Sequence, residues 1–215
     1  MSKKVLIIGT SPRKNGNSNR LAQEFEKGAR EAGNDVDVVY LYDKNINFCK
    51  GCLACQKLNH CVIDDDANSI TEKIHNAEVI VWATPVYYYE MCGQMKTMID
   101  RSNPLYTMDN KFEDIYLLAA AAEPETSAFD GAIKGLQGWI DCHEKAHLKG
   151  VIRGLGADVI GAIEGNPALN EAYYKQTLII RFKTPKDEIN LKKKIYRAVN
   201  FGTEFVLLQV IFTVR

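Results

Sequence analysis

Residues 3–21 read KKVLIIGTSPRKNGNSNRL, and this stretch decides the fold class. Its first part (3–9) is a short apolar, β-branched run of the kind that forms a buried strand. A polar turn rich in glycine, proline and asparagine follows. The next segment (18–33) places apolar residues at a spacing of four, beginning with Leu21 and Phe25, which predicts a helix that stops at its final glycine. The stretch is therefore a strand, a turn and a helix, the repeating unit of an α/β protein.

The same alternation continues along the chain to about residue 175. We expect further strands at 35–42, 78–85 and 114–122 and within 148–164, and further helices at 64–77, 93–102, 129–147 and 166–175. Five such strand–helix units predict an α/β fold, a doubly wound five-stranded parallel sheet with helices on both faces. We therefore expect one domain at residues 1–175.

Residues 176–215 fit this alternation less well and are expected to form a C-terminal extension of uncertain structure. In this extension we expect an extra strand at 176–182 and an amphipathic helix at 185–205. The tail VLLQVIFTVR (206–215) is apolar and β-prone, so it needs burial in a sheet, under a helix or in a partner subunit.

The composition excludes some classes of protein. The chain has 215 residues, in which 27 Lys and Arg balance 27 Asp and Glu, so no net field attracts nucleic acid or an anionic membrane. The apolar run after MSKK is too short for a signal peptide, and no run approaches the roughly 18 apolar residues of a membrane span. We expect a cytoplasmic protein that binds neither nucleic acid nor membrane. In a reducing cytosol, clustered cysteines indicate metal or redox chemistry more than disulfides.

The turn after the first strand, GTSPRKNGNSNRL (9–21), suits an anion. Backbone N–H groups at a helix N-terminus form an anion site. Neutral donors and one positive charge can be added by Ser11, Asn17, Ser18, Asn19 and Arg13. The turn lacks both the Walker lysine and the dinucleotide glycine pattern, so it suits a monophosphate ester. The alternative is a polar loop with an ordinary helix cap at Ser18.

Two further loops should meet this turn, because ligands of such sheets bind beyond the carboxyl ends of the strands. One is TPVYYYEMC (84–92), which offers flat aromatic surface and backbone amides to a heterocycle. The other is AAAEPETS (120–127), whose small residues let a ring approach the backbone. The alternative for the tyrosines is packing on the next helix.

Together these segments resemble the NADPH-dependent FMN reductase family, within the flavodoxin-like superfamily. The resemblance runs from residue 3 to about 175 and rests on residues 9–21, on residues 49–102 and on the strand ending AAAA (119–122). It implies a flavodoxin-like fold, FMN bound without a covalent link, and a homodimer or higher homo-oligomer with flavin sites near the subunit interface. The family commonly has a glycine-containing third loop where this chain has AAAAEP.

The family pattern also implies which residues contact FMN. The phosphate contacts fall on Ser11, Arg13, Asn17, Ser18 and Asn19, the isoalloxazine contacts on Pro85, Val86, Tyr87 and Tyr88, and the third-loop contacts on Ala121, Ala122 and Glu123.

The segment CKGCLACQKLNHC (49–61) holds four of the six cysteines, Cys49, Cys52, Cys55 and Cys61. Their spacing resembles the compact motif of the iron–sulfur flavoproteins, a branch of the same superfamily that carries a 4Fe–4S cluster beside FMN. Three cysteines two residues apart can wrap one side of a cubane cluster, and a fourth nearby closes it. The neighbouring His60 leaves zinc open as an alternative. Free or partly oxidised thiols without metal are a second alternative.

Other residues near these loops are expected to have structural roles. Asp65 or Asp66 is expected to cap the helix that follows. Asp100 and Arg101 either form an ion pair that braces the tyrosine loop or are surface charges. Cys92 is expected as a buried small side chain, with a flavin contact as the alternative.

The function that follows is an FMN-dependent oxidoreductase. It would take hydride from NADH or NADPH and pass electrons to a flavin, a quinone, an aromatic compound or a protein acceptor, with the 4Fe–4S cluster as a candidate intermediate carrier. Because the cofactor carries such chemistry, no acid–base residue is nominated. The alternatives are a flavodoxin-type electron carrier between proteins and a zinc-stapled flavodoxin-like binding module without FMN.

Overall fold

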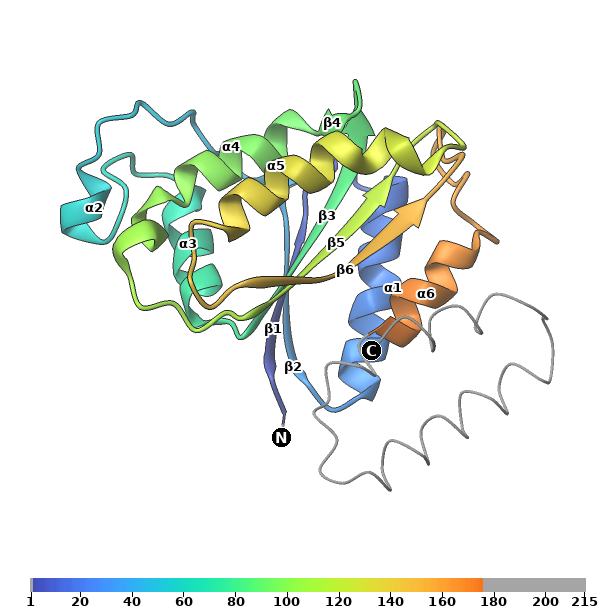
Figure 1. Ribbon diagram of the computed structural model, residues 1–215, viewed down its shortest axis with the longest axis horizontal. Coiled ribbons are helices and arrows are strands. Elements are labelled where there is room, and N and C mark those ends of the chain that lie inside the picture. Colours follow the sequence, from blue (N-terminus) through green and yellow to red (C-terminus); the bar gives the residue numbers. More distant parts are fainter. Residues whose placement is uncertain (1, 176–215) are drawn as a thin grey trace. The chain divides into compact units, whose positions relative to one another are not determined.

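The computed structural model describes residues 2–175 (Figure 1). The strands are β1 Lys4–Gly9, β2 Asp35–Tyr40, β3 Val79–Tyr87, β4 Glu90–Met91, β5 Asp114–Ala120 and β6 His147–Gly154. The helices are α1 Asn17–Glu31, α2 Cys55–Leu58, α3 Asp66–Asn76, α4 Gly93–Arg101, α5 Asp130–Ile140 and α6 Pro167–Lys175, with 3-10 turns η1 Leu41–Asp43, η2 Asn103–Thr107 and η3 Thr126–Phe129. The elements expected at 176–182, 185–205 and 206–215 lie outside the described residues.

The sheet has the order β2-β1-β3-β5-β6, and all of these neighbours are parallel. β4 adds only a short antiparallel pairing to the end of β3. The expected doubly wound sheet of five parallel strands is therefore confirmed. Among residues 2–175, no helix combines the length and the apolar character needed to cross a bilayer.

Helices cover both faces of the sheet because side chains alternate along each strand. In β1, Leu6 and Ile8 join a buried cluster with α3, α4 and α5. Their neighbours Val5 and Ile7 join a second cluster with α1 and α6. Figure 1 shows these helices around the twisted sheet. Burial on both faces explains why the strands read as continuous apolar runs in the sequence.

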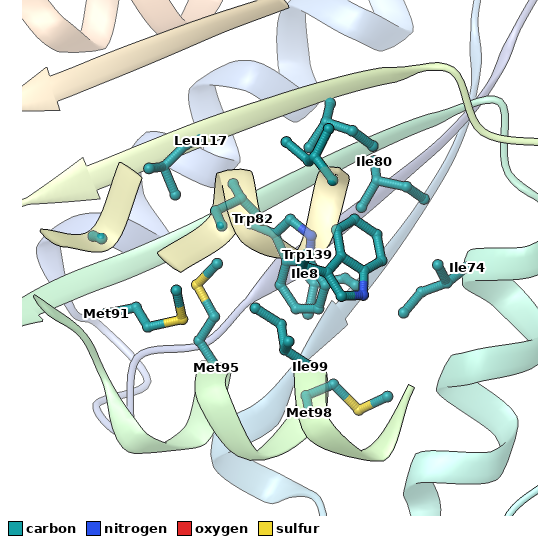
Figure 2. Packing of buried hydrophobic residues seen from close by; sticks show 14 of the residues in the cluster. Ile8, Ile74, Ile80, Trp82, Met91, Met95, Met98, Ile99, Leu117 and Trp139 are labelled. Carbon is teal, nitrogen blue, oxygen red and sulfur yellow. The ribbon is translucent and has the colours of Figure 1, made fainter. Parts of the chain in front are cut away.

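The first cluster centres on two tryptophans (Figure 2). The rings of Trp82 in β3 and Trp139 in α5 meet edge to face, with 6.0 Å between their centroids. Met95 and Ile99 bring α4 against this pair. The indole Nε1 of Trp139 donates a hydrogen bond of 3.1 Å to Ser102 Oγ, just after α4. This packing fixes α4 and α5 on one face of the sheet.

Two expected elements have different bounds in the structure. The helix expected at 129–147 ends at Ile140, and β6 begins at His147. The His147 N–H donates to Glu113 O at 2.7 Å, which starts the pairing of β6 with β5. Sheet pairing between distant segments therefore outweighs the local helical pattern. The cysteine segment (49–61) also contains a short helix, α2, that the sequence analysis does not predict.

The tyrosine loop folds as a tight hairpin between β3 and β4. Val86 pairs with Met91 and Tyr87 with Glu90, so Tyr88 and Tyr89 form the two-residue turn. Their φ angles of 50° and 63° are both positive, as in a type I′ turn. Such turns favour asparagine and glycine, so two tyrosines here hold a strained backbone.

Glycine in α5 lets this hairpin approach the helix. A Cβ at Gly131 would lie 2.3 Å from the Tyr89 carbonyl oxygen. A Cβ at Gly138, on the same helix, would have no heavy atom within 4 Å.

We expect Gly131→Ala to destabilise the protein by roughly 1–3 kcal/mol, because the hairpin or the helix must shift to remove the clash. Gly138→Ala, the matched control, should instead stabilise it by up to about 1 kcal/mol through helix propensity. Urea unfolding followed by circular dichroism measures both. Equal stabilities for the two variants would contradict the close packing of hairpin and helix.

Candidate functional site

Three loops gather at one edge of the sheet because their strands are parallel and in register. Gly9 at the end of β1 pairs with Ala83, and Pro85 in β3 pairs with Ala120 at the end of β5. The Thr10 N–H extends this ladder with a 2.8 Å bond to Ala83 O. The residues predicted to contact the phosphate and the ring, and those of the third loop, therefore all follow strands that end at the same edge of the sheet.

The N-terminus of α1 presents unpaired donors. The first helical bond runs from the Arg20 N–H to Gly16 O at 3.0 Å, so the N–H groups of residues 17–19 have no acceptor within the helix. No side chain caps this end. Ser18 is 1% exposed, and its Oγ has no hydrogen-bond partner among the described residues. A buried hydroxyl beside free N–H groups is a ready anion site.

The glycine before α1 is required by a close approach. A Cβ on Gly16 would lie 2.3 Å from Ser11 Oγ. That hydroxyl accepts a 3.1 Å bond from the Arg13 N–H, which curls the loop. Arg13 itself is exposed, so its guanidinium is free to reach a bound anion.

The side chain of Asn17 is occupied within the protein. Its Nδ2 donates to the carbonyl oxygens of Ala157 at 3.0 Å and Val159 at 2.8 Å. Its Oδ1 accepts from the Gly161 N–H at 3.1 Å. Asn17 can therefore offer an anion only its backbone N–H.

The side chain of Asn19 also shapes the loop. Its Nδ2 donates to the carbonyl oxygens of Arg13 at 3.1 Å and Lys14 at 3.3 Å. Like Asn17, it leaves its backbone N–H toward the helix N-terminus.

A fourth loop, residues 155–161, ties two of the others together, and the sequence reasoning missed it. Besides its bonds to Asn17, the Ala157 N–H donates to Ala121 O at 2.7 Å and the Gly156 N–H to Glu123 O at 3.1 Å. Gly156 and Gly161 both have positive φ. In the sequence, these two glycines after β6 could have predicted a structured turn.

The predicted ring-binding residues form an open surface. Pro85 and Val86 are half-buried, whereas the side chains of Tyr87, Tyr88 and Tyr89 are 42%, 100% and 60% exposed. Tyr88 therefore does not pack on the next helix, whereas Tyr87 has more than half of its surface covered. A fully exposed aromatic ring is surface available to a flat ligand or to a partner.

The third loop contributes Ala121–Glu123, a short wall that begins with two small residues. Ala121 is buried, while Ala122 and Glu123 are exposed. Ala121 is fixed at both backbone groups, since its N–H donates to Gly154 O at 3.0 Å and its carbonyl accepts from Ala157. The wall is therefore positioned by the fourth loop.

Cys92, the last residue of the tyrosine loop, contacts the loop after β1 through a buried polar cluster. Its Sγ lies 3.3 Å from Thr10 Oγ1 and 3.4 Å from Thr84 Oγ1. Its N–H donates to Thr84 Oγ1 at 3.2 Å. Cys92 is buried as expected, but among polar groups and at the start of α4.

A buried ion pair closes the cysteine segment. Arg101 at the end of α4 donates from Nη1 to Asp65 Oδ2 at 2.7 Å and from Nη2 to Asp65 Oδ1 at 2.9 Å, and both side chains are 0% exposed. The guanidinium also donates to the carbonyl oxygens of Asn47 at 2.7 Å and Ile63 at 3.2 Å. Arg101 thus joins the two ends of the loop that holds the four cysteines. The ion pair suggested between Asp100 and Arg101 does not form: Asp100 is a surface charge, as in the alternative, and pairs with Lys96.

The charge on Asp65 is strongly stabilised. Burial by itself would raise the pKa of its carboxyl, but hydrogen bonds from Arg101 and Asn47 outweigh burial and hold that pKa well below its usual range. Asp65 also accepts from the Ala67 N–H at 3.1 Å, which confirms it as the cap of α3. Because the unfolded value is about 3.9, this stabilisation is present above that pH and is lost as the pH falls toward the folded-state pKa.

The four cysteines of the segment are free thiols in different environments. Cys49 and Cys52 are exposed, Cys61 is half-buried and Cys55 is buried. Asn68 binds both backbone groups of Cys61: its Oδ1 accepts from the Cys61 N–H at 2.9 Å, and its Nδ2 donates to the Cys61 carbonyl oxygen at 3.0 Å. Within residues 2–175, no three Cys, His, Asp or Glu side chains converge on one point where they could hold a metal ion. The thiols supply the ligand chemistry of a cluster in one closed loop, but they are not drawn together around a centre.

The strand order, the uncapped phosphate-type loop and the aromatic hairpin define a flavodoxin-like α/β protein. The sequence profile of the NADPH-dependent FMN reductase family matches residues 3–144. The chain belongs to this family and is an oxidoreductase, as the resemblance predicted.

Similar proteins agree with this assignment. The chain is 31% identical over 195 residues to an iron-sulfur flavoprotein of Methanosarcina thermophila, an alignment that covers 89% of this chain and 97% of that one. It is 35% identical over 130 residues to an iron-sulfur flavoprotein of Archaeoglobus fulgidus, covering 59% of each.

Solved structures share the fold. A NAD(P)H:quinone oxidoreductase from Methanothermobacter marburgensis superimposes with a TM-score of 0.66 at 17% identity, covering 86% of this chain and 99% of that one. An FMN-dependent NADH-azoreductase from Bacillus anthracis, in complex with FMN, gives 0.58 at 12% identity, covering 83% and 99%.

Replacing Arg101 by Met should destabilise the protein by about 3–5 kcal/mol, because it leaves the buried Asp65 carboxylate without its partner. Asp100→Asn, one residue away, breaks only an exposed pair and should change stability by less than about 1 kcal/mol. Urea unfolding at pH 7 compares them. If the two variants unfold at the same urea concentration, the buried pair does not hold the segment.

Proposed function

We propose that this oxidoreductase binds FMN, takes hydride from NADH or NADPH and passes electrons to a flavin, quinone, aromatic or protein acceptor. The observation that carries the proposal is the partnerless, buried Ser18 hydroxyl beside three uncapped N–H groups, at the same edge of the sheet as an exposed aromatic hairpin. A phosphate ester would satisfy these donors.

The residues present suit FMN. The N–H groups of residues 17–19, the Ser18 hydroxyl and the Arg13 guanidinium would hold the phosphate, with Ser11 shaping the loop. Pro85, Val86, Tyr87 and Tyr88 would lie along the ring, and the wall Ala121–Glu123 would limit its edge. FMN, when bound, supplies hydride acceptance and transfer of one or two electrons. The chain contributes binding, stacking surface and exclusion of water.

We also propose a 4Fe–4S cluster on Cys49, Cys52, Cys55 and Cys61. Support comes from four free thiols in one closed loop and from the relatives named iron-sulfur flavoproteins. Such a cluster supplies one-electron transfer. Zinc stays the alternative metal, because the contact of His60 Nδ1 with Leu58 O at 2.9 Å leaves Nε2 available as a ligand.

The remaining parts of the proposal concern assembly and location. A homodimer with flavin sites near the subunit interface is what the family resemblance implies, and the exposed ring of Tyr88 is surface that a partner subunit could share with the flavin. A cytoplasmic location is favoured by six free cysteines. Residues 1–175 are proposed as the FMN-binding domain, with 176–215 as its extension.

Ser18→Ala should weaken FMN binding by roughly tenfold or more, because it removes a hydrogen bond to a charged phosphate. The apoprotein should lose no stability, since Ser18 Oγ has no partner to lose. Ser69→Ala, an exposed serine on α3, is the control and should bind FMN as the wild type does. Calorimetric titration of apoprotein measures affinity, and urea unfolding measures stability. Unchanged FMN affinity in Ser18→Ala would contradict the phosphate site.

Protein purified without oxygen should contain about four iron atoms per chain and FMN, and NADPH or NADH should bleach the flavin absorbance. Cys52→Ser should remove the iron and keep FMN, because Cys52 is exposed and lies outside the flavin loops. Cys142→Ser, also exposed, should keep both. Iron-free wild type would contradict the cluster, and a flavin that ignores both nucleotides would favour the electron-carrier alternative.

A further inference from the structure

The side chain of Asn103 lies outside the cysteine segment and touches one of its sulfurs. Its Nδ2 lies 3.1 Å from Cys55 Sγ, across 48 residues of chain. Cys55 is 7% exposed and is the buried member of the four. Its sulfur therefore depends on protein donors rather than on water for hydrogen bonds.

Asn103 is held in place by the core. It follows Ser102, whose N–H donates to Met98 O at 2.9 Å and whose Oγ donates to Ile99 O at 2.7 Å. The same Oγ accepts from Trp139 Nε1. The backbone that carries the donor is thus held at the end of α4 by bonds made outside the cysteine segment.

A second contact joins η2 to α2 without reaching a sulfur. Thr107 Oγ1 donates to Gln56 O at 3.2 Å. Removing this contact loosens the same pair of elements while leaving the amide–sulfur bond intact. Thr107 therefore provides a control for a purely structural role.

The physical effect of the Asn103 amide has a definite sign. One-electron reduction of a thiolate-bound iron–sulfur cluster adds negative charge that spreads onto its sulfurs. A hydrogen bond to a ligand sulfur stabilises the more negative, reduced state, and such bonds help to set cluster potentials. Loss of the donor therefore makes the cluster harder to reduce.

We propose that Asn103 is a positioning residue that raises the reduction potential of the cluster by donating a hydrogen bond to Cys55 Sγ. This inference rests on the proposed cluster. It assigns the tuning of that cluster to the turn after α4, outside the cysteine motif.

The test is a potentiometric titration with dithionite and redox mediators, read by low-temperature electron paramagnetic resonance of the cluster. Asn103→Leu keeps a similar volume without the donor, and Asn103→Ala removes it without any clash. Each should lower the equilibrium constant for reduction by about tenfold, which is 59 mV for one electron. Asn103→Asp should lower it further, because a carboxylate beside a thiolate disfavours added negative charge. Thr107→Val should leave the potential unchanged.

The outcomes are distinguishable. Reduction potentials that fall from wild type to Asn103→Leu and Asn103→Ala, and further to Asn103→Asp, support the inference. A purely structural role gives no reason for this order. Equal potentials in loaded wild type and variants would overturn it while leaving the proposed function intact. Loss of iron from both Leu and Ala variants would also overturn it, since Asn103 would then be needed for assembly. Wild type without iron would overturn the cluster proposal and this inference together.

Discussion

The parallel ladder between β1 and β3 is the constraint on which the rest of the site depends. Its last bond, from the Thr10 N–H to Ala83 O, holds the ends of the two strands side by side at one edge of the sheet. The segment after β1 leads into α1, and the segment after β3 leads into the tyrosine hairpin. Cys92 then bonds to hydroxyls from both sides. A shift of one residue in this register would reverse which side chains face each layer, and the two loops would no longer meet.

Helix α4 carries this order to the cysteine segment. It starts at the Cys92 cluster and ends at Arg101, which binds Asp65 and both ends of the segment. Nine residues of helix span about 13 Å at 1.5 Å per residue. The tryptophan cluster holds α4 to the sheet (Figure 2), so α4 sets the spacing between the proposed flavin loops and the cysteine segment.

Exposure and strain coincide at the tip of the hairpin. Tyr88 and Tyr89 hold left-handed backbone that bulky side chains disfavour, and their rings lie in solvent. The pairing of β3 with β4 and the close approach to Gly131 maintain this conformation. The strain thus presents aromatic surface beside the phosphate loop, where a flat cofactor would use it.

The sequence by itself determined the class of fold, because buried parallel strands and amphipathic helices leave periods that can be read locally. It also singled out the proposed phosphate loop, the tyrosine loop and the cysteine segment, whose residue types are distinctive. It could not show that the Asn17 amide would be taken by residues 157–161, or that Arg101 would choose Asp65 over its neighbour Asp100. These choices join segments 36 to 144 residues apart. Only the tertiary structure decided them, because the partners of a buried polar group are set by what packing brings within about 3 Å and not by what lies nearby in the chain.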